Sequence, residues 1–271
     1  MAPEQPSSQK RPASGRARES WSNLSRAGKW VVGVVLAAAI GAPVGTLSTK
    51  LLTPDDGPEN STTSPESVIF QDHFATTGEK RWTDDADPDE MARRYTDGAY
   101  EISALRARDR WGVLAWPRGP VEENVHLTVK AHRVDGTATE GFGYGLFCRA
   151  DGQANLYAFT IWANHATIEK RIDGQAHTLR TNGDWTAAVD GDTEKELQVV
   201  CTTIGRGSAV ELQFWVDGDP KLAYTDKDDP YASGTYGMYA ALGKSKGNIG
   251  DTLKVQFDDF VATEPASTPS R

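Results

Sequence analysis

The stretch Val210-Glu-Leu-Gln-Phe-Trp-Val-Asp-Gly218 shows the pattern that decides the fold of this chain. Every second residue from Val210 to Val216 is apolar, and the stretch ends in Asp-Gly. A period of two indicates a strand with one buried face. Asp-Gly tolerates positive φ and is typical of tight hairpin turns. The stretch therefore predicts a strand of an antiparallel sheet followed by a hairpin.

The same period recurs on both sides of this stretch. Residues 125–131, 197–201 and 253–257 alternate apolar and polar positions, and Asp-Gly pairs punctuate the chain. Denser apolar runs at residues 142–148 and 156–162 suit strands in the middle of a sheet. About a dozen short strands without amphipathic helices or a βαβ rhythm predict an all-β fold. We expect a two-sheet antiparallel jelly-roll sandwich with Greek-key connections.

An uncharged run at residues 30–48 is long enough to cross a bilayer. About 19 residues at ~1.5 Å rise span roughly the ~30 Å hydrocarbon core. Residues 1–29 carry six Lys or Arg and two Glu, so the positive-inside rule predicts a cytoplasmic N terminus and an extracellular C-terminal domain. A cleaved signal peptide is the alternative, because the small residues that precede Pro43 also resemble an export signal.

Charge is divided between the two ends of the chain. Residues 1–50 carry +5 and the whole chain carries −9, so residues 51–271 carry −14. A surface of that sign repels nucleic acid phosphate, whose recognition requires a basic footprint. We therefore expect no nucleic-acid partner.

Composition divides the chain into five parts. Residues 49–66 are rich in Pro, Ser, Thr and acidic residues, which predicts a solvated stalk, and the C-terminal tail has a similar composition. The predicted parts are a basic disordered cytoplasmic head (1–29), a single transmembrane helix at the cell membrane (30–48), a flexible stalk (49–66), an extracellular jelly-roll domain (67–263) and a disordered tail (264–271).

Cys148 and Cys201 are the two cysteines of the chain. Both lie in apolar runs of one domain, and outside the cell such a pair most simply forms a disulfide. Closing a loop of roughly 50 residues would contribute about 4 kcal/mol in the chain-entropy model. A thiol metal site would require further His or Cys ligands, and the five histidines show no ligand-type spacing.

Several short stretches, taken in their order along the chain, resemble those of a known family. They are Phe70-Gln-Asp-His-Phe74, Tyr144-Gly-Leu-Phe-Cys-Arg149, Asn155-Leu-Tyr-Ala-Phe159, Leu197-Gln-Val-Val-Cys201, Leu212-Gln-Phe-Trp-Val-Asp-Gly218, Gly234-Thr-Tyr-Gly-Met-Tyr239 and Phe257-Asp-Asp-Phe260. Together they resemble the concanavalin A-like, laminin G-like jelly roll of exported, membrane-anchored actinobacterial proteins, and they are similar to its 3-keto-disaccharide hydrolase-like relatives. The resemblance implies a lectin-like sandwich over residues 67–263. It implies no particular ligand, because this fold hosts binders, hydrolases and spacers.

Motifs of catalysis are absent from the sequence. No stretch matches the Glu-x-Asp-x-x-Glu strand motif of sandwich glycosidases, and no nucleophile elbow, P-loop, HExxH or EF-hand pattern is present. Glycoside hydrolysis needs two carboxyls at a set separation. We interpret Asp151, Glu169, Asp184 and Asp192 as exposed turn acids. The sequence therefore predicts no catalytic residue.

Tryptophans provide the binding hypothesis, because exposed indoles stack on the apolar faces of sugars beside polar groups that bind hydroxyls. Trp162 and Trp215 lie in strand runs and are predicted to be core residues. Loop positions suit ligand contact better. The predicted ligand-binding residues are Trp185, Trp116, Asn182 and Asp184.

Three acidic residues near the ends of the domain suggest a cation site. Asp72, Asp258 and Asp259 would supply oxygen ligands to a structural Ca²⁺ where the terminal strands meet; the alternative is turn and edge acids that face water. No other cofactor is expected. The predicted function is a membrane-anchored extracellular lectin-like module that binds carbohydrate or a cell-envelope polymer without catalysis. A glycoside-acting enzyme with an unrecognised site and a protein-interaction ectodomain are the alternatives.

Overall fold

A computed structural model of the 271-residue chain describes residues 66–75, 79–87, 91–105, 112–119, 121–138, 141–183, 193–243 and 250–265. All of these residues belong to one compact unit, Glu59–Arg271. The predicted head, membrane helix and stalk up to residue 65 lie outside the described residues. Within the described ranges, no helix has the length and apolar character needed to cross a membrane.

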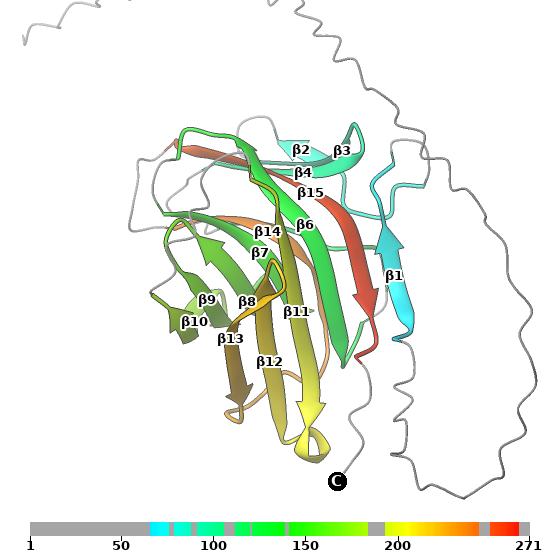
Figure 1. The fold of residues 1–271 in the computed structure, drawn as a ribbon, viewed down its shortest axis with the longest axis vertical. Helices are drawn as coiled ribbons and strands as arrows, with labels where there is room; N and C mark the ends of the chain where they lie inside the picture. Colours follow the sequence, from blue (N-terminus) through cyan, green and yellow to red (C-terminus); the bar gives the residue numbers. More distant parts are fainter. Residues whose placement is uncertain are drawn as a thin grey trace, which may run out of the picture. The chain divides into compact units, whose positions relative to one another are not determined.

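The described residues form two antiparallel sheets that pack face to face (Figure 1). The nine-stranded sheet has the order β13-β12-β11-β6-β15-β4-β3-β2, and β1 pairs with the second half of β15. Its strands are β1 (Val68–Asp72), β2 (Asp85–Asp87), β3 (Met91–Thr96), β4 (Ala99–Leu105), β6 (Val125–Asp135), β11 (Lys195–Ile204), β12 (Ala209–Val216), β13 (Asp219–Asp226) and β15 (Thr252–Thr263).

The six-stranded sheet has the order β10-β9-β8-β7-β14-β5. Its strands are β5 (Gly112–Ala115), β7 (Phe142–Asp151), β8 (Asn155–Trp162), β9 (Ala166–Ile172), β10 (Gln175–Asn182) and β14 (Thr235–Leu242). A single 3₁₀ turn, η1 (Gly205–Gly207), joins β11 to β12 in the described part of the chain. The prediction of an all-β, two-sheet antiparallel sandwich is confirmed.

The main core lies between the two sheets. Leu127 of β6 and Phe214 of β12 come from the nine-stranded sheet, and Leu146 of β7 and Phe159 of β8 come from the six-stranded sheet. All four are fully buried. The rings of Phe159 and Phe214 meet edge to face with their centroids 5.9 Å apart. Each large apolar side chain buried here stabilises the fold by about 1.5–3 kcal/mol.

The predicted disulfide is present and joins the two sheets. Cys148 of β7 and Cys201 of β11 are bonded, with their Cα atoms 6.7 Å apart and a sequence separation of 53 residues. Both residues are fully buried. The bond therefore lies inside the main core and ties one layer of the sandwich to the other.

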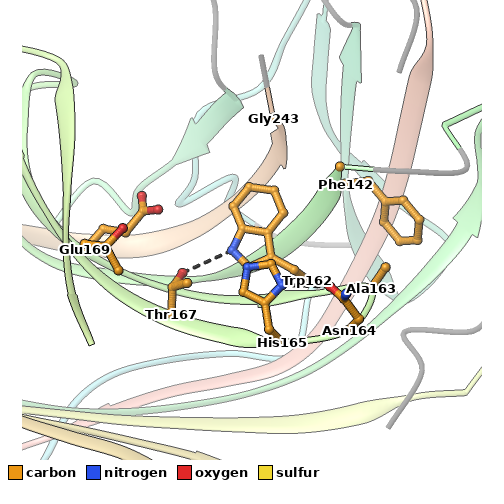
Figure 2. A pocket seen from close by; sticks show the side chains of 10 residues that line it. Phe142, Trp162, Ala163, Asn164, His165, Thr167, Glu169 and Gly243 are labelled. Atoms are coloured by element: carbon orange, nitrogen blue, oxygen red, sulfur yellow. Dashed lines mark hydrogen bonds between the residues drawn. The ribbon is translucent and has the colours of Figure 1, made fainter. Parts of the chain in front are cut away.

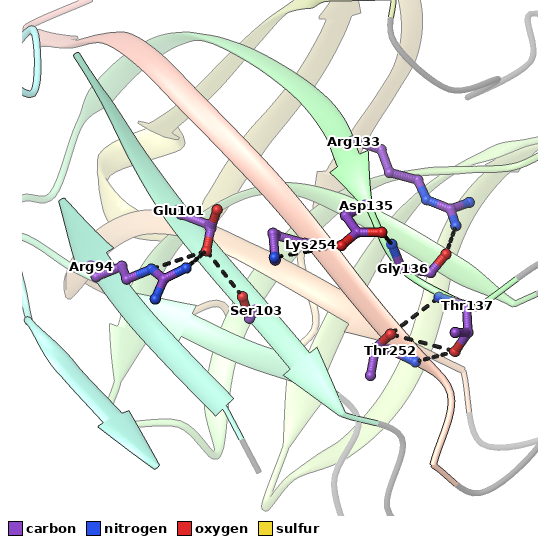
Figure 3. Close-up of polar contacts among 9 residues, drawn as sticks. All are labelled: Arg94, Glu101, Ser103, Arg133, Asp135, Gly136, Thr137, Thr252 and Lys254. Atoms are coloured by element: carbon purple, nitrogen blue, oxygen red, sulfur yellow. Dashed lines mark hydrogen bonds and ion pairs between the residues drawn. The ribbon is translucent and has the colours of Figure 1, made fainter. Parts of the chain in front are cut away.

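Polar side chains contact one another on the outer face of the nine-stranded sheet (Figure 3). Arg94 of β3 donates to Glu101 of the neighbouring strand β4 at 2.6 Å, and Lys254 of β15 lies 3.6 Å from Asp135 at the end of β6. The Arg94 side chain is half exposed, and most of the Asp135 side chain is in solvent. The Glu101 side chain, by contrast, is buried beside Arg94. An exposed pair such as Lys254–Asp135 contributes about 0–1 kcal/mol. This face is thus a solvated surface, as one face of an antiparallel sheet commonly is.

Candidate functional site

The outer face of the six-stranded sheet differs from that of the nine-stranded sheet because it carries a cluster of apolar side chains. A second cluster of buried residues lies there, with Trp116 and Trp162 packed against it. The cluster consists of Leu114, Phe147, Ala150, Leu156, Ala158, Tyr239 and Ala241. These seven residues are themselves buried, whereas Trp116 and Trp162 at the margin of the cluster are partly exposed. An antiparallel sheet commonly presents one polar face to water, so a partly exposed indole on this face is a candidate contact for a ligand.

Two glycines of β7 shape this face. Gly143 pairs with Trp162 and Gly145 pairs with Thr160 across the β7–β8 ladder. A Cβ atom on Gly143 would lie 2.9 Å from Cε3 of Trp162, and one on Gly145 would lie 1.8 Å from the carbonyl oxygen of Phe159. Strand glycines mark such close approaches. The missing side chain at Gly143 leaves the space against β7 that the indole of Trp162 occupies.

A cavity of about 240 Å³ lies at the end of the six-stranded sheet that holds Trp162, the last residue of β8 (Figure 2). Its walls come from the turn between β8 and β9, from the start of β7, from the residue that follows β14 and from the outward side chains of β9 and β10. The lining residues are Gly141, Phe142, Trp162, Ala163, Asn164, His165, Thr167, Glu169, Thr178 and Gly243.

Trp162 is held in one orientation within this cavity. Its Nε1–H donates to Oγ1 of Thr167 at 3.1 Å (Figure 2). Its ring stacks on the imidazole of His165, with centroids 5.9 Å apart and an interplanar angle of 11°. The backbone N–H of Trp162 donates to the carbonyl of His165 at 2.8 Å and closes the hairpin. Asn164 Oδ1 lies 2.8 Å from His165 Nδ1, which fixes the imidazole in turn.

Glu169 of β9 supplies a carboxylate to the same cavity. It lies opposite Thr178 of β10 and Ala158 of β8 in the sheet register. Its oxygen Oε2 is 3.3 Å from Nη2 of Arg171, and both side chains are almost completely buried. Burial raises the pKa of Glu169 above its ordinary value, although the charge of Arg171 acts in the opposite direction.

The cavity has one carboxylate among its described lining residues. A glycosidase uses two carboxyl groups, roughly 5 Å apart for retention and wider for inversion. The described lining therefore lacks the second acid that glycoside hydrolysis requires. An oriented indole beside hydroxyl, amide and carboxylate groups instead has the chemistry of a binding site for a polyhydroxylated ligand.

The predicted binding residues are placed as follows. Trp185 and Asp184 lie outside the described residues, so their assignment stays a prediction. Asn182, the last residue of β10, pairs with Ala166, the first residue of β9, and so lies at the cavity's end of the sheet. Trp116 follows β5 and borders the second apolar cluster, with the guanidinium of Arg93 5.6 Å from its ring centroid. Neither Asn182 nor Trp116 lines the cavity.

Two other interpretations of the sequence are wrong. Trp162 is on the outer face and lines the cavity, not the main core. Glu169 is buried within β9 and is not an exposed turn acid. Asp151 is exposed as expected, and Asp192 is outside the described residues. Phe159 and Ile161 of β8 enter the main core, which places Trp162 on the opposite face together with Thr160. The polar Thr160 is the weak signal for this in the sequence.

The three acidic residues of the predicted calcium site lie on adjacent terminal strands, because β1 pairs with β15. Asp259 is engaged by two side chains: its oxygens lie 2.7 Å from Lys130 Nζ and 2.7 Å from His73 Nδ1. These contacts hold the pKa of Asp259 below its ordinary value. Asp258 accepts from the backbone N–H of Asp259, and Asp72 accepts from a backbone N–H two residues on. The described residues contain no group of three His, Cys, Asp or Glu suited to a metal, so calcium binding stays a prediction.

No protein-family model matches the sequence, and no curated protein matches it in sequence. Solved structures are similar in fold. The carbohydrate-binding module CBM66 from Bacillus subtilis has a TM-score of 0.51 and 11% identity, covering 68% of this chain and 96% of that one. A protein of unknown function with a galectin-like fold from Bacillus subtilis has a TM-score of 0.50 and 12% identity, covering 73% and 96%.

An enzyme shares the same architecture. A prokaryotic β-1,3-1,4-glucanase (lichenase) derived from a mouse hindgut metagenome has a TM-score of 0.51 and 12% identity, covering 72% of this chain and 98% of that one. At these identities the similarity shows the fold alone. The described domain therefore has the concanavalin A-like jelly-roll fold that the sequence resemblance implied.

Proposed function

We propose that the domain binds a carbohydrate chain on the outer face of the six-stranded sheet, with Trp162 as its stacking platform. The observation that carries the proposal is the fixed indole of Trp162, which lines a cavity together with Thr167 and Glu169. The apolar face of a sugar ring stacks on an indole, while its hydroxyls need donors and acceptors at the edge of the ring. The cavity supplies both.

Each polar group of the cavity has a role in this proposal. Glu169 accepts hydrogen bonds from sugar hydroxyls, and Arg171, two residues further along the same strand, positions its carboxylate. Asn164 and Thr178 line the cavity and offer amide and hydroxyl groups. The net charge of −14 over residues 51–271 favours an uncharged ligand over a polyanion.

The membrane anchor forms part of the proposal. The basic head and residues 30–48 would hold the domain outside the cell, where polysaccharides of the envelope or the surroundings are within reach. Protease added to intact cells is expected to remove the domain and leave a small membrane stub. A soluble mature protein that starts near residue 43 would contradict the anchor and leave the binding site untouched.

Affinity electrophoresis of the full-length chain in non-ionic detergent tests the binding site. The gels would contain β-1,3-1,4-glucan, the polymer after which one structural neighbour is named, or another neutral polysaccharide selected on a glycan array. Trp162→Ala is expected to weaken binding by about 1–3 kcal/mol, or roughly 5- to 150-fold. Glu169→Gln keeps the shape of the side chain and is expected to weaken binding less.

The control is Ile172→Ala, which removes a 41% exposed apolar side chain at the end of the same strand as Glu169. It should migrate as the wild type does. A Trp162→Ala chain that keeps its melting temperature and its full affinity would overturn the proposal. Release of reducing ends from the polymer by the wild type, and its loss in Glu169→Gln, would favour the enzyme alternative.

A further inference from the structure

A second tryptophan faces outward on the opposite side of the sandwich. In β12 the residues Val210, Leu212, Phe214 and Val216 enter the main core. Trp215 lies between the last two of them, points to the outer face and is partly exposed. The prediction that Trp215 is a core residue is therefore wrong, although the period of the strand itself indicates an outward position.

Among the described residues, Trp215 has no polar or aromatic partner on this face. Within the described residues its side chain takes part in no hydrogen bond, ion pair or aromatic contact. It lies opposite Gln198 of β11 and opposite Pro220 of β13, so it stands inside the sheet and not at its edge. An indole without such a partner among the described residues, on a face that also carries the polar residues Gln198 and Gln213, is available for stacking.

Two glutamines beside Trp215 are held by carboxylates. Gln198 Nε2 donates to Glu196 Oε1 at 2.6 Å, and Gln213 Nε2 donates to Glu211 Oε1 at 2.6 Å. Gln198 is directly across from Trp215, and Gln213 precedes it by two residues on the same face. Each amide is thereby fixed by its N–H group, which leaves the carbonyl oxygen of the glutamine and the second carboxylate oxygen as acceptors.

We propose that Trp215, Gln198 and Gln213 form a second binding site, on the outer face of the nine-stranded sheet, for a neutral polysaccharide chain. Fixed acceptors around an indole suit a ligand that carries many hydroxyl donors and an apolar ring face. Glu196 and Glu211, within a domain of strongly negative charge, disfavour a polyanion. The ligand class rests on the proposed function, whereas the residues are separate from those of the cavity.

The two sites lie on opposite outer faces of the sandwich, because Trp162 belongs to the six-stranded sheet and Trp215 to the nine-stranded sheet. One chain segment cannot contact both. Two sites that face apart make the domain bivalent, so it can bind two polymer chains at once or gain avidity in a dense polymer layer. Cross-linking of a soluble polysaccharide is therefore a property that a domain with the cavity alone would lack.

The test compares Trp215→Ala, Trp162→Ala and the double variant of the full-length chain. Affinity gels contain β-1,3-1,4-glucan or xylan, and turbidity on mixing with the same polymers reports cross-linking. We expect Trp215→Ala to reduce retardation roughly fivefold or more and to abolish turbidity. The double variant should lose retardation altogether.

Gln198→Ala is a second variant, needed in case Trp215→Ala disturbs folding. It removes an acceptor from the outer face and leaves the core intact, and it should also weaken retardation. Gln256→Ala is the matched control: this glutamine is partly exposed on β15, opposite His132 and Glu101 and away from Trp215. It should behave as the wild type does.

The outcomes separate the two sites. If Trp215→Ala and Gln198→Ala both retain wild-type retardation and turbidity, the second site does not exist. If Trp215→Ala abolishes binding while Trp162→Ala has no effect, the cavity proposal fails and the second site stands. If neither polymer slows the migration of the wild type, both proposals fail for neutral polysaccharides.

Discussion

Lys170 Nζ lies 2.9 Å from Oδ2 of Asp226, and both side chains are almost completely buried. Lys170 belongs to β9 of the six-stranded sheet, and Asp226 ends β13 of the nine-stranded sheet. The hydroxyl of Tyr157 donates to the same carboxylate oxygen at 2.6 Å. Lys170 also donates to the backbone carbonyls of Asp228 and Asp229. The pair therefore fixes the chain where it leaves one sheet for the other.

This pair predicts a specific response to acid. Burial raises the pKa of Asp226, but hydrogen bonds from Tyr157 and Lys170 outweigh it and hold the pKa below the ordinary value of 3.8. A carboxylate with a depressed folded pKa stabilises the fold above its unfolded pKa, and this contribution is lost as pH falls through the folded value. Below about pH 4, the unfolding free energy of the wild type should fall more steeply than that of Asp226→Asn.

Urea denaturation over a pH series measures this difference. Asp219→Asn on the same strand is the control, because its side chain is 77% exposed and its contact with Lys221 is long, at 3.5 Å. It should follow the wild-type profile. Parallel profiles for the wild type and Asp226→Asn would show that the carboxylate does not contribute in this way.

Removing the cation from the pair should destabilise the fold strongly. Lys170→Met leaves a buried carboxylate without its ammonium group, and loss of one member of a buried pair destabilises by about 3–5 kcal/mol. In a double-mutant cycle with Asp226→Asn, the two losses should be clearly less than additive, since the residues are in contact. Additive losses measured by urea denaturation at neutral pH would contradict the coupling.

The disulfide should contribute strongly to stability. Cys148→Ala/Cys201→Ala is expected to lower the unfolding free energy by about 2–5 kcal/mol, with the fold retained because both positions accept a small apolar side chain in the core. Since the bond is fully buried, a reductant should act slowly on the native protein and rapidly in denaturant. Alkylation with mass spectrometry follows this, and two modifiable thiols in native protein purified without reductant would refute the bond.

The sequence predicts the fold well because the period of two is visible where one face of a strand is polar. In β6 and β12 the residues that alternate are those that enter the main core. The period is weak in β8, where residues 156–162 are apolar on both faces except for Thr160, so an outward Trp162 looks like a core residue. For this reason the sequence does not reveal the candidate cavity.

Strand β9 shows a second limit. Its residues Glu169, Lys170 and Arg171 are consecutive and charged, which indicates a solvated segment, yet all three are buried. The partner of Lys170 is Asp226, 56 residues further along the chain by their numbers. Convergence of distant charges depends on strand order, and a single sequence does not contain that information.

Gly145 is predicted to be intolerant of any side chain. A Cβ atom there would lie 1.8 Å from the carbonyl oxygen of Phe159, and the neighbouring strand must shift to admit it. Inserting atoms into a packed site destabilises by about 1–3 kcal/mol, and sometimes more. Gly183→Ala is the matched control, because a Cβ atom at that position would have no neighbour within 4 Å among the described residues. Thermal denaturation should show a large loss for Gly145→Ala and almost none for Gly183→Ala.

Gly143 connects packing to binding in a way that Gly145 does not. A Cβ atom on Gly143 would press on the indole of Trp162, 2.9 Å from Cε3, as well as on the carbonyl oxygen of Ile161 at 2.7 Å. The indole would have to tilt away from β7, and its hydrogen bond to Thr167 would weaken. We therefore expect Gly143→Ala to lose affinity for neutral polysaccharide by a larger factor than its loss of stability explains. The measurement is affinity electrophoresis at a temperature well below the melting point of the variant. Gly119→Ala is the control for an added methyl group, because a Cβ atom at that position would meet its nearest neighbour, Cδ2 of Phe70, at 3.8 Å. A stable Gly143→Ala chain with wild-type affinity would show that the orientation of Trp162 does not determine binding.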